Sequence, residues 1–310
     1  MSEAALGDLA LESGEKILDF RQSYVTHGES NRDKSNAVLI CSSLTGNHRR
    51  LDFLIGPGKA LDPARYFIVA TDAIGNGLST SPSNSTRQPR MAFPRFTVRD
   101  MVAAQRRLLV EHLGVTRLHA IAGASMGGMQ ALQWAVSHPR FMGSIVAMTP
   151  MAKTAPWAAL VVRTARACLM ADAAWNGTEF ERVPERGWRA YAGLMSALLM
   201  RTPGAVEGLD FENIVAQHRA RGFDAHDYLY QSWAYEAHDI GDPQLIEART
   251  LILAPPLDLF NPAESARAAA AAIPRARFVE IPSRQGHLAA GDTDPEDAAF
   301  LNRSIMEFLR

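Results

Sequence analysis

The residues from Leu118 to Pro139, LHAIAGASMGGMQALQWAVSHP, carry the strongest chemical signal in this sequence. Within them GASMG, residues 123–127, matches G-x-S-x-G, in which a serine occupies a sharp turn between a strand and a helix. A short apolar run precedes the pattern and apolar residues at helical spacing follow it, so both flanking elements are in place. The context therefore favours Ser125 as a nucleophile over an incidental serine in a glycine-rich turn.

A serine hydroxyl becomes a useful nucleophile when a base takes its proton and a third group orients that base. His287 and Asp258 are the candidates for these two roles, because each comes just after a late apolar strand, residues 277–281 and 250–254 respectively. Parallel strands that end at one sheet edge place their following loops together. We therefore expect Ser125, Asp258 and His287 to meet at that edge.

Other acids and histidines fit this arrangement less well. Asp242 precedes its strand and Asp292 follows the histidine, whereas the expected chain order is serine, acid, histidine. Three further histidines fall in a helical stretch, where solvated or capping roles are expected: His218, His226 and His238.

The chemistry that these residues predict is acyl transfer through a covalent intermediate. Ser125 attacks an ester or thioester carbonyl, and His287 takes the proton and later returns it to the leaving group, while Asp258 orients the imidazole. The backbone N–H of Met126 and, by position, that of Leu44 are the expected donors to the oxyanion. Such donors each lower the barrier by roughly 3 kcal/mol.

Alternating strand and helix patterns surround these residues and predict an α/β fold with a mostly parallel central sheet flanked by helices. We expect residues 1–13 to form a loose arm, followed by a strand over 15–26. Later strands are expected at 37–41, 66–71, 118–121, 144–148, 250–254 and 277–281. The loop DAIGNGLSTSPSNS, residues 72–85, lacks the motifs of a phosphate loop and is interpreted as a surface loop near the rim of the site.

The pattern changes between residues 151 and 241, where only helical runs occur and aromatic residues and methionines are dense. We interpret this stretch as a helical lid inserted into a core made of residues 1–150 and 242–310. Many of its apolar residues must form ordinary helical core, but some, with Tyr228 as a candidate, are expected to line the route to Ser125.

Composition limits the classes of partner. The chain has 310 residues, 32 basic and 33 acidic, with a net charge of -1, so nothing favours nucleic acid or an anionic membrane as a partner. Cys41 and Cys168 are expected to be reduced core thiols, and the nine histidines show no metal-binding spacing. Without a secretory pattern or an apolar run of membrane-spanning length, a cytoplasmic enzyme with no bound metal is expected.

Several segments resemble the homoserine O-acetyltransferase family of α/β hydrolases. They cover most of the chain and are SLTGNH (43–48), LIGPGKALDPARYFIVATDAIGNG (54–77), FPRFTVRDMVAAQRRLLVEHLGV (93–115), GASMGGMQALQWAV (123–136), RACLMADAAWNG (166–177) and FDAHDYLYQSWAYEAHDIG (223–241). The resemblance implies an α/β-hydrolase fold, a Ser-Asp-His triad under a helical lid, acyl-enzyme chemistry and a homodimer formed through the lid. It also implies no bound cofactor, with acetyl-CoA as an acyl donor.

Single positions follow from this resemblance. Ser125 and His287 fall on the family's nucleophile and base, and Leu44 and Met126 fall on its oxyanion positions. Arg166 falls on a lid arginine that helps to build the acceptor site.

The departures from the family concern the acceptor. Family transferases usually have an aspartate directly after the catalytic histidine, where it meets the amino group of homoserine, and this chain has Leu288. A tyrosine-arginine pair of the lid is Met200-Arg201 here, and the acid loop reads LDLF instead of DWLF, which shifts the acid by one position. Loss of one charge-assisted contact costs roughly 1.5–3 kcal/mol, so homoserine binding should be weaker.

Three functions are compatible with these residues. The first is a serine hydrolase that cleaves a small ester or a related acyl substrate. The alternative is an O-acyltransferase that uses homoserine or another alcohol, and the third is a non-catalytic binding protein, which the apparently complete triad disfavours. Arg49 and Arg50 follow the loop that carries Leu44 and are interpreted as solvated surface rather than as partners of a CoA phosphate.

Overall fold

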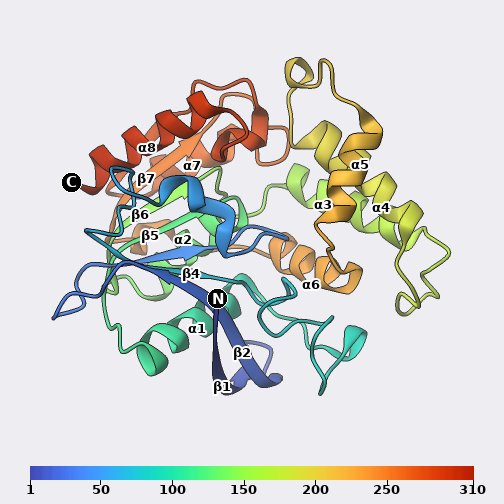
Figure 1. Ribbon diagram of the computed structural model, residues 1–310, viewed down its shortest axis with the longest axis horizontal. Coiled ribbons are helices and arrows are strands. Elements are labelled where there is room, and N and C mark those ends of the chain that lie inside the picture. The colour runs from blue at the N-terminus through green and yellow to red at the C-terminus, as the bar shows by residue number, and fades with distance from the viewer.

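A computed structural model describes all residues from Met1 to Arg310 and contains one eight-stranded sheet (Figure 1). The strand order is β1-β2-β4-β3-β5-β6-β7-β8. β2 runs antiparallel to both of its neighbours, β1 and β4, and the six strands β3 to β8 are parallel to one another. The strands are β1 (Ser2–Ala10), β2 (Lys16–His27), β3 (Ala37–Cys41), β4 (Phe67–Thr71), β5 (Leu118–Ala124), β6 (Met142–Met148), β7 (Arg249–Ala254) and β8 (Ala276–Glu280). This sheet confirms the predicted fold class.

The prediction of a loose arm over residues 1–13 is wrong. Residues 2–10 form β1, which pairs with β2 along its length, with register shifts around Gly7. Alanine, glycine and aspartate are weak strand formers, which is why the local pattern gave little sign of a strand. Pairing overrides that weakness because Ala4, Leu6 and Leu9 bury their side chains in the core.

Helices flank the sheet on both faces. They are α1 (Val98–Arg107), α2 (Met126–Ser137), α3 (Pro156–Met170), α4 (Glu185–Tyr191), α5 (Phe211–Ala220), α6 (Ala225–Glu236), α7 (Ala263–Ala272) and α8 (Pro295–Leu309). Further helical segments include η1 (His48–Leu54), η4 (Ala192–Leu199) and η7 (Gly286–Ala290). No helix is both long enough and apolar enough to span a bilayer.

Side chains of each central strand point alternately to the two faces of the sheet, and those on each face pack into a separate apolar core. In β3, Leu39 and Cys41 join the core that includes α1 and α2, whereas Val38 and Ile40 join the core that includes α8. Because both faces are covered, the central strands read as continuous apolar runs. This packing fixes the sheet edge from which the loops after β3, β5, β7 and β8 leave.

All four helices from α3 to α6 lie between β6 and β7 in the chain, and this segment contains no strand. It lies to one side of the sheet, at the right in Figure 1. Its role as a lid, and the division of the chain at residues 151 and 241, stay predictions. We call residues 156–236 the helical insertion.

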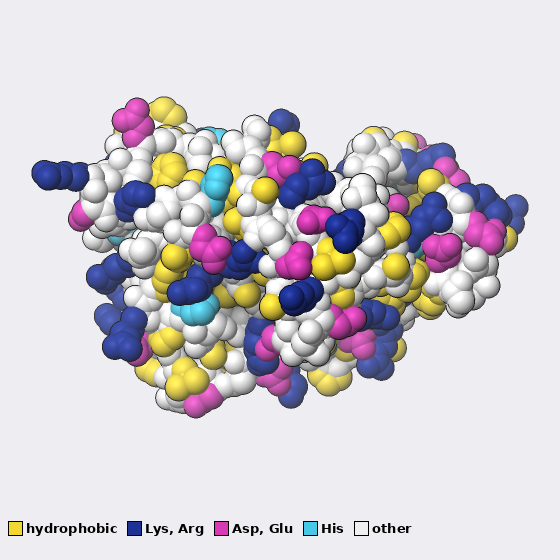
Figure 2. Space-filling model, turned by 90° about the horizontal axis from the view of Figure 1, so that it is seen from below, with side chains coloured by type: hydrophobic (Ala, Val, Ile, Leu, Met, Phe, Trp, Pro, Cys, Tyr) yellow, Lys and Arg dark blue, Asp and Glu magenta, His cyan; other side chains and the backbone are white.

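The surface carries both signs of charge close together. Figure 2 shows Lys and Arg interspersed with Asp and Glu over the face seen from below. Neither cysteine is in a disulfide; Cys41 is buried in β3, and Cys168 in α3 is partly exposed.

Candidate active site

Ser125 occupies a strained turn between β5 and α2. Its φ is 58° and its ψ is -123°, a conformation that costs a non-glycine residue on the order of 1–3 kcal/mol. The two flanking glycines make the turn possible, because a Cβ at Gly123 would collide with the carbonyl of Gly127, and one at Gly127 would collide with the carbonyl of Cys41. The strand and the helix thus approach so closely that only glycine fits on either side of the serine.

The structure brings Ser125, His287 and Asp258 together in one hydrogen-bonded chain. Nε2 of His287 lies 2.9 Å from Oγ of Ser125, and its Nδ1 lies 2.7 Å from Oδ2 of Asp258. The three residues are only 5%, 2% and 6% exposed, in the same order. The acid follows β7 and the histidine lies in η7, which follows β8, as their positions after late strands predict.

The loop that carries Asp258 is fixed by residues that the sequence patterns did not reveal. Asn261 donates from Nδ2 to the carbonyl oxygen of Thr149 at 2.7 Å, and its Oδ1 accepts from the hydroxyl of Tyr235 in α6. Tyr235 also stacks on Phe260, whose ring lies edge-on to His287 with centroids 5.0 Å apart. The only local signal is an asparagine three residues after the acid, since the aromatic partner is distant in the chain.

A cavity of about 470 Å³ opens over Ser125 and His287. Leu44 and Leu288 line it from the core, while Tyr191, Met195 and Met200 line it from the helical insertion. The N–H of Leu44 makes no hydrogen bond within the chain. The N–H of Met126 is the first of α2, where helical N–H groups have no intrahelical partner.

Two of the predicted substrate-binding residues do not reach this cavity. The guanidinium of Arg166 pairs with Glu236 and donates to Oγ of Ser232 at 3.2 Å. Tyr228 borders a second cavity of about 340 Å³, and its hydroxyl is buried without a hydrogen-bond partner. Leu288 is the one of the three that lines the cavity over Ser125 and His287.

The expectation that Arg49 and Arg50 are both solvated holds only for Arg49. Arg50 is half-buried at the wall of the first cavity and donates from Nη2 to the carbonyl oxygen of Ala290 at 2.8 Å. Burial lowers the pKa of its guanidinium. The positive charge of Arg221 lowers this pKa further, whereas the negative charge of Asp292 raises it.

The expectation of a solvated or capping role for His218, His226 and His238 is wrong as to solvation, because all three are at most 5% exposed. Burial lowers the pKa of both His218 and His238 to about 4, so both are neutral at pH 7. Of the three, His226 takes part in capping, since its Nδ1 lies 3.2 Å from the N-cap residue Asp224. Their burial is not evident from the local pattern, because buried residues of the helical insertion, such as Trp188 and Tyr228, belong to the same apolar core as α1 and α2.

The loop over residues 72–85 is also not the surface loop that was expected. Asp72, Ser79 and Ser81 are buried, and the loop contacts the helical insertion where Ser83 donates from N and from Oγ to the carboxylate of Asp227. Burial, with a smaller contribution from Asp224, raises the pKa of Asp227 to about 7. No group of three or more His, Cys, Asp or Glu side chains is arranged to hold a metal ion.

Comparison with known proteins points to one family. Residues 36–292 match the model of the alpha/beta hydrolase fold. The chain is 32% identical to a homoserine O-acetyltransferase from Methanosalsum zhilinae over 95% of this chain and 71% of that protein. Among solved structures, an acetylester hydrolase from Corynebacterium glutamicum superposes with a TM-score of 0.93 at 29% identity, over 99% of this chain and 95% of that one. A homoserine O-acetyltransferase from Bacillus anthracis superposes with a TM-score of 0.88 at 25% identity, over 100% and 97%.

Proposed function

Because this chain belongs to the homoserine O-acetyltransferase family of α/β hydrolases, we propose that it is a serine-dependent acyl-transfer enzyme that hydrolyses a small ester or a related acyl compound. The observation that carries the proposal is the chain of hydrogen bonds from Ser125 through His287 to Asp258 beside a cavity. This arrangement matches the roles of nucleophile, base and orienting acid.

In the first half-reaction, Oγ of Ser125 attacks the acyl carbon while Nε2 of His287 takes the hydroxyl proton. The negative charge that develops on the carbonyl oxygen is held by the N–H groups of Leu44 and Met126. The carbon–oxygen bond to the leaving group then breaks, and His287 passes its proton to that group. Asp258 stabilises the imidazolium throughout, and an acyl group remains on Ser125.

In the second half-reaction, His287 removes a proton from water, and the resulting oxygen nucleophile attacks the acyl carbon. Collapse of this second tetrahedral intermediate returns the proton to Ser125 and releases the acid. An alcohol in place of water would give a new ester, which is the only step that separates hydrolysis from transfer.

The side chain directly after His287 supports hydrolysis. Leu288 lines the cavity over Ser125. The resemblance to the family implies an aspartate at this position in its transferases. A leucine offers nothing to pair with the ammonium group of homoserine, so the cavity loses one charge-assisted contact to that acceptor. The likeness to an acetylester hydrolase at a TM-score of 0.93 points in the same direction.

Transfer to an alcohol, with acetyl-CoA as donor, is the second candidate, and the 32% identity to a protein named homoserine O-acetyltransferase favours it. A homodimer formed through the helical insertion belongs to either proposal. Exposed apolar side chains on that insertion support it, namely Trp157, Leu160 and Leu198.

One set of assays separates the two reactions. The protein is mixed with p-nitrophenyl acetate, and separately with acetyl-CoA in the presence and absence of homoserine. We expect nitrophenol release that homoserine does not change, and no thiol release from acetyl-CoA that depends on homoserine. Thiol release that requires homoserine would replace the hydrolase proposal with the transferase.

A further inference from the structure

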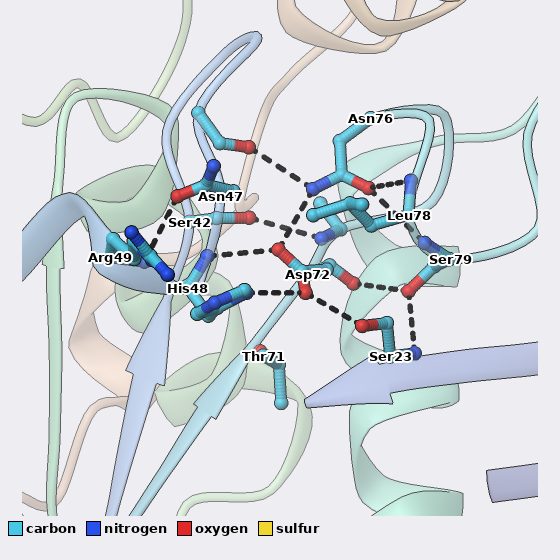
Figure 3. A network of polar contacts seen from close by, with 12 residues as sticks. Ser23, Ser42, Asn47, His48, Arg49, Thr71, Asp72, Asn76, Leu78 and Ser79 are labelled. Carbon is cyan, nitrogen blue, oxygen red and sulfur yellow. Dashed lines mark hydrogen bonds and ion pairs between the residues drawn. The ribbon is translucent and has the colours of Figure 1, made fainter. Parts of the chain in front are cut away.

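A second carboxylate–imidazole pair lies next to the loop that follows β3 (Figure 3). Asp72, at the end of β4, is fully buried, and its Oδ2 lies 2.9 Å from Nδ1 of His48 and accepts from Oγ of Ser23 at 2.8 Å. Its Oδ1 accepts from the backbone N–H of His48 at 2.8 Å and from Nδ2 of Asn76 at 3.1 Å. No Lys or Arg pairs with this carboxylate, so these four contacts must offset the cost of its burial.

These contacts connect the loop that follows β4, residues 72–85, to residues 42–48, which we call the Leu44 loop. His48 is bound through both its backbone and its ring, and it closes the loop at one end. Asn76 contributes a second tie, because its Nδ2 also donates to the carbonyl oxygen of Gly46 at 3.1 Å. At the other end, the N–H of Ala73 donates to Oγ of Ser42 at 3.0 Å.

The Leu44 loop is also tied to the elements around Ser125. Oγ of Ser43 donates to the carbonyl oxygen of Ala124 at 2.8 Å, and the N–H of Thr45 donates to Oε1 of Gln231 in α6 at 2.8 Å. Thr45 has a φ of 55°, which a threonine holds only when its surroundings impose it. The N–H of Leu44, which lies between Ser43 and Thr45, makes no hydrogen bond within the chain.

The second pair does not itself perform chemistry on a substrate. Neither Asp72 nor His48 lines the cavity over Ser125, although Asn47 and Arg49 on either side of His48 do. Any effect of the pair on the site must therefore pass through the loop that it holds.

We infer that Asp72 and His48 are positioning residues that hold the Leu44 loop so that the N–H of Leu44 points at the developing oxyanion. This inference rests on the proposed function, since it assigns a purpose to a loop of the same site. A fixed donor costs no reorganisation when the charge appears, whereas a displacement of about 1 Å can cost on the order of 10²-fold in rate.

The test compares three measurements on p-nitrophenyl acetate hydrolysis: kcat, KM and the inhibition constant of a trifluoromethyl ketone, whose adduct with a serine carries an oxyanion. The variant His48→Leu removes the ring contact to Asp72, and His48→Asn returns a donor close to the position of Nδ1. We expect His48→Leu to lower kcat by about 10²-fold with KM within twofold, and to weaken the ketone by a similar factor. His48→Asn should restore most of both losses.

A second pair of variants keeps the test decisive if His48→Leu does not fold. Asn76→Ala removes the tie to Gly46, while Asn84→Ala, in the same loop, removes contacts only to Gly77, Ser79 and Ser81. Asn76→Ala should weaken the ketone and lower kcat in parallel, and Asn84→Ala should do neither.

The inference is overturned if kcat and ketone binding stay at wild-type values in His48→Leu or in Asn76→Ala. It is also overturned if His48→Asn behaves as His48→Leu does, or if a fall in kcat comes without weaker ketone binding. The variant Ser125→Ala tests the proposed function separately. If Ser125→Ala is inactive while His48→Leu is fully active, the positioning role is refuted and the proposed function stands.

Discussion

The two carboxylate oxygens of Asp258 have different partners: Oδ2 faces Nδ1 of His287 at 2.7 Å, while Oδ1 accepts the backbone N–H groups of Phe260 and Asn261 at 2.9 and 2.8 Å. The backbone donors fix the orientation of the side chain. Whatever group replaces Oδ2 must therefore face the imidazole.

This geometry predicts the effect of Asp258→Asn. The amide oxygen will take the two backbone N–H groups, so Nδ2 will point at Nδ1 of His287 and force the tautomer that is protonated at Nε2. That tautomer cannot accept the proton of Ser125, and we expect kcat for p-nitrophenyl acetate to fall by about 10⁴-fold. Asp292→Asn, which alters an exposed carboxylate lining the same cavity, is the control and should leave most activity in place. Comparable losses in both variants would argue against Asp258 as the orienting acid.

Leu288→Asp tests the acceptor preference. The new carboxylate would face the catalytic cavity and pair with the ammonium group of homoserine, which is worth roughly 1.5–3 kcal/mol, or about 10- to 150-fold in kcat/KM. The measurement is homoserine-dependent thiol release from acetyl-CoA. Leu288→Asn has nearly the same shape without the charge and should give no gain; equal behaviour of the two variants would remove this position as a specificity determinant.

Gly123→Ala tests the close approach of β5 and α2. The added Cβ collides with the backbone carbonyl of Gly127, which cannot move without displacing the serine turn. We expect a loss of about 1–3 kcal/mol in the free energy of unfolding, measured by urea denaturation, together with a loss of activity. At Gly204 the nearest atom to an added Cβ is 4.0 Å away, so Gly204→Ala should change stability by less than about 0.5 kcal/mol. Equal stability of the two variants would mean that the turn is not as tight as described.

The raised pKa of Asp227 predicts how the free energy of unfolding changes with pH. Burial raises its pKa from 3.8 to about 7 in the folded chain, so the native state binds more protons than the unfolded state between these values. Stability contributed by this residue should therefore fall as pH rises from about 4 to 7. Asp227→Asn keeps an acceptor for the N–H of Ser83 and does not titrate. The difference in free energy of unfolding, wild type minus variant, should decrease over that window, and parallel curves for the two proteins would contradict the raised pKa.

Ser125, His287 and Asp258 could be identified from the sequence as neighbours in space, because each follows a recognisable local pattern. Ser125 lies in a glycine-flanked turn, and Asp258 and His287 each follow an apolar strand, so the order of a parallel sheet brings them to one edge. The same reasoning located nearly all strands, since strands buried on both faces are apolar throughout.

Features that depend on distant partners could not be found in this way. Asp72 looks like a surface residue in isolation, because aspartate is rarely fully buried, and its partners Ser23, His48 and Asn76 come from three separate segments. Likewise, nothing local marks Glu236, which comes from another helix of the insertion, as the partner of the Arg166 guanidinium.

The central claim is that Ser125 carries the acyl group, and the direct measurement is nitrophenol release from p-nitrophenyl acetate by Ser125→Ala. Ser137→Ala, at the exposed end of α2, is the matched control, and circular dichroism verifies that both variants fold. We expect Ser125→Ala to lose at least about 10³-fold in kcat while Ser137→Ala keeps wild-type activity. A folded Ser125→Ala that releases nitrophenol at the wild-type rate would contradict the mechanism.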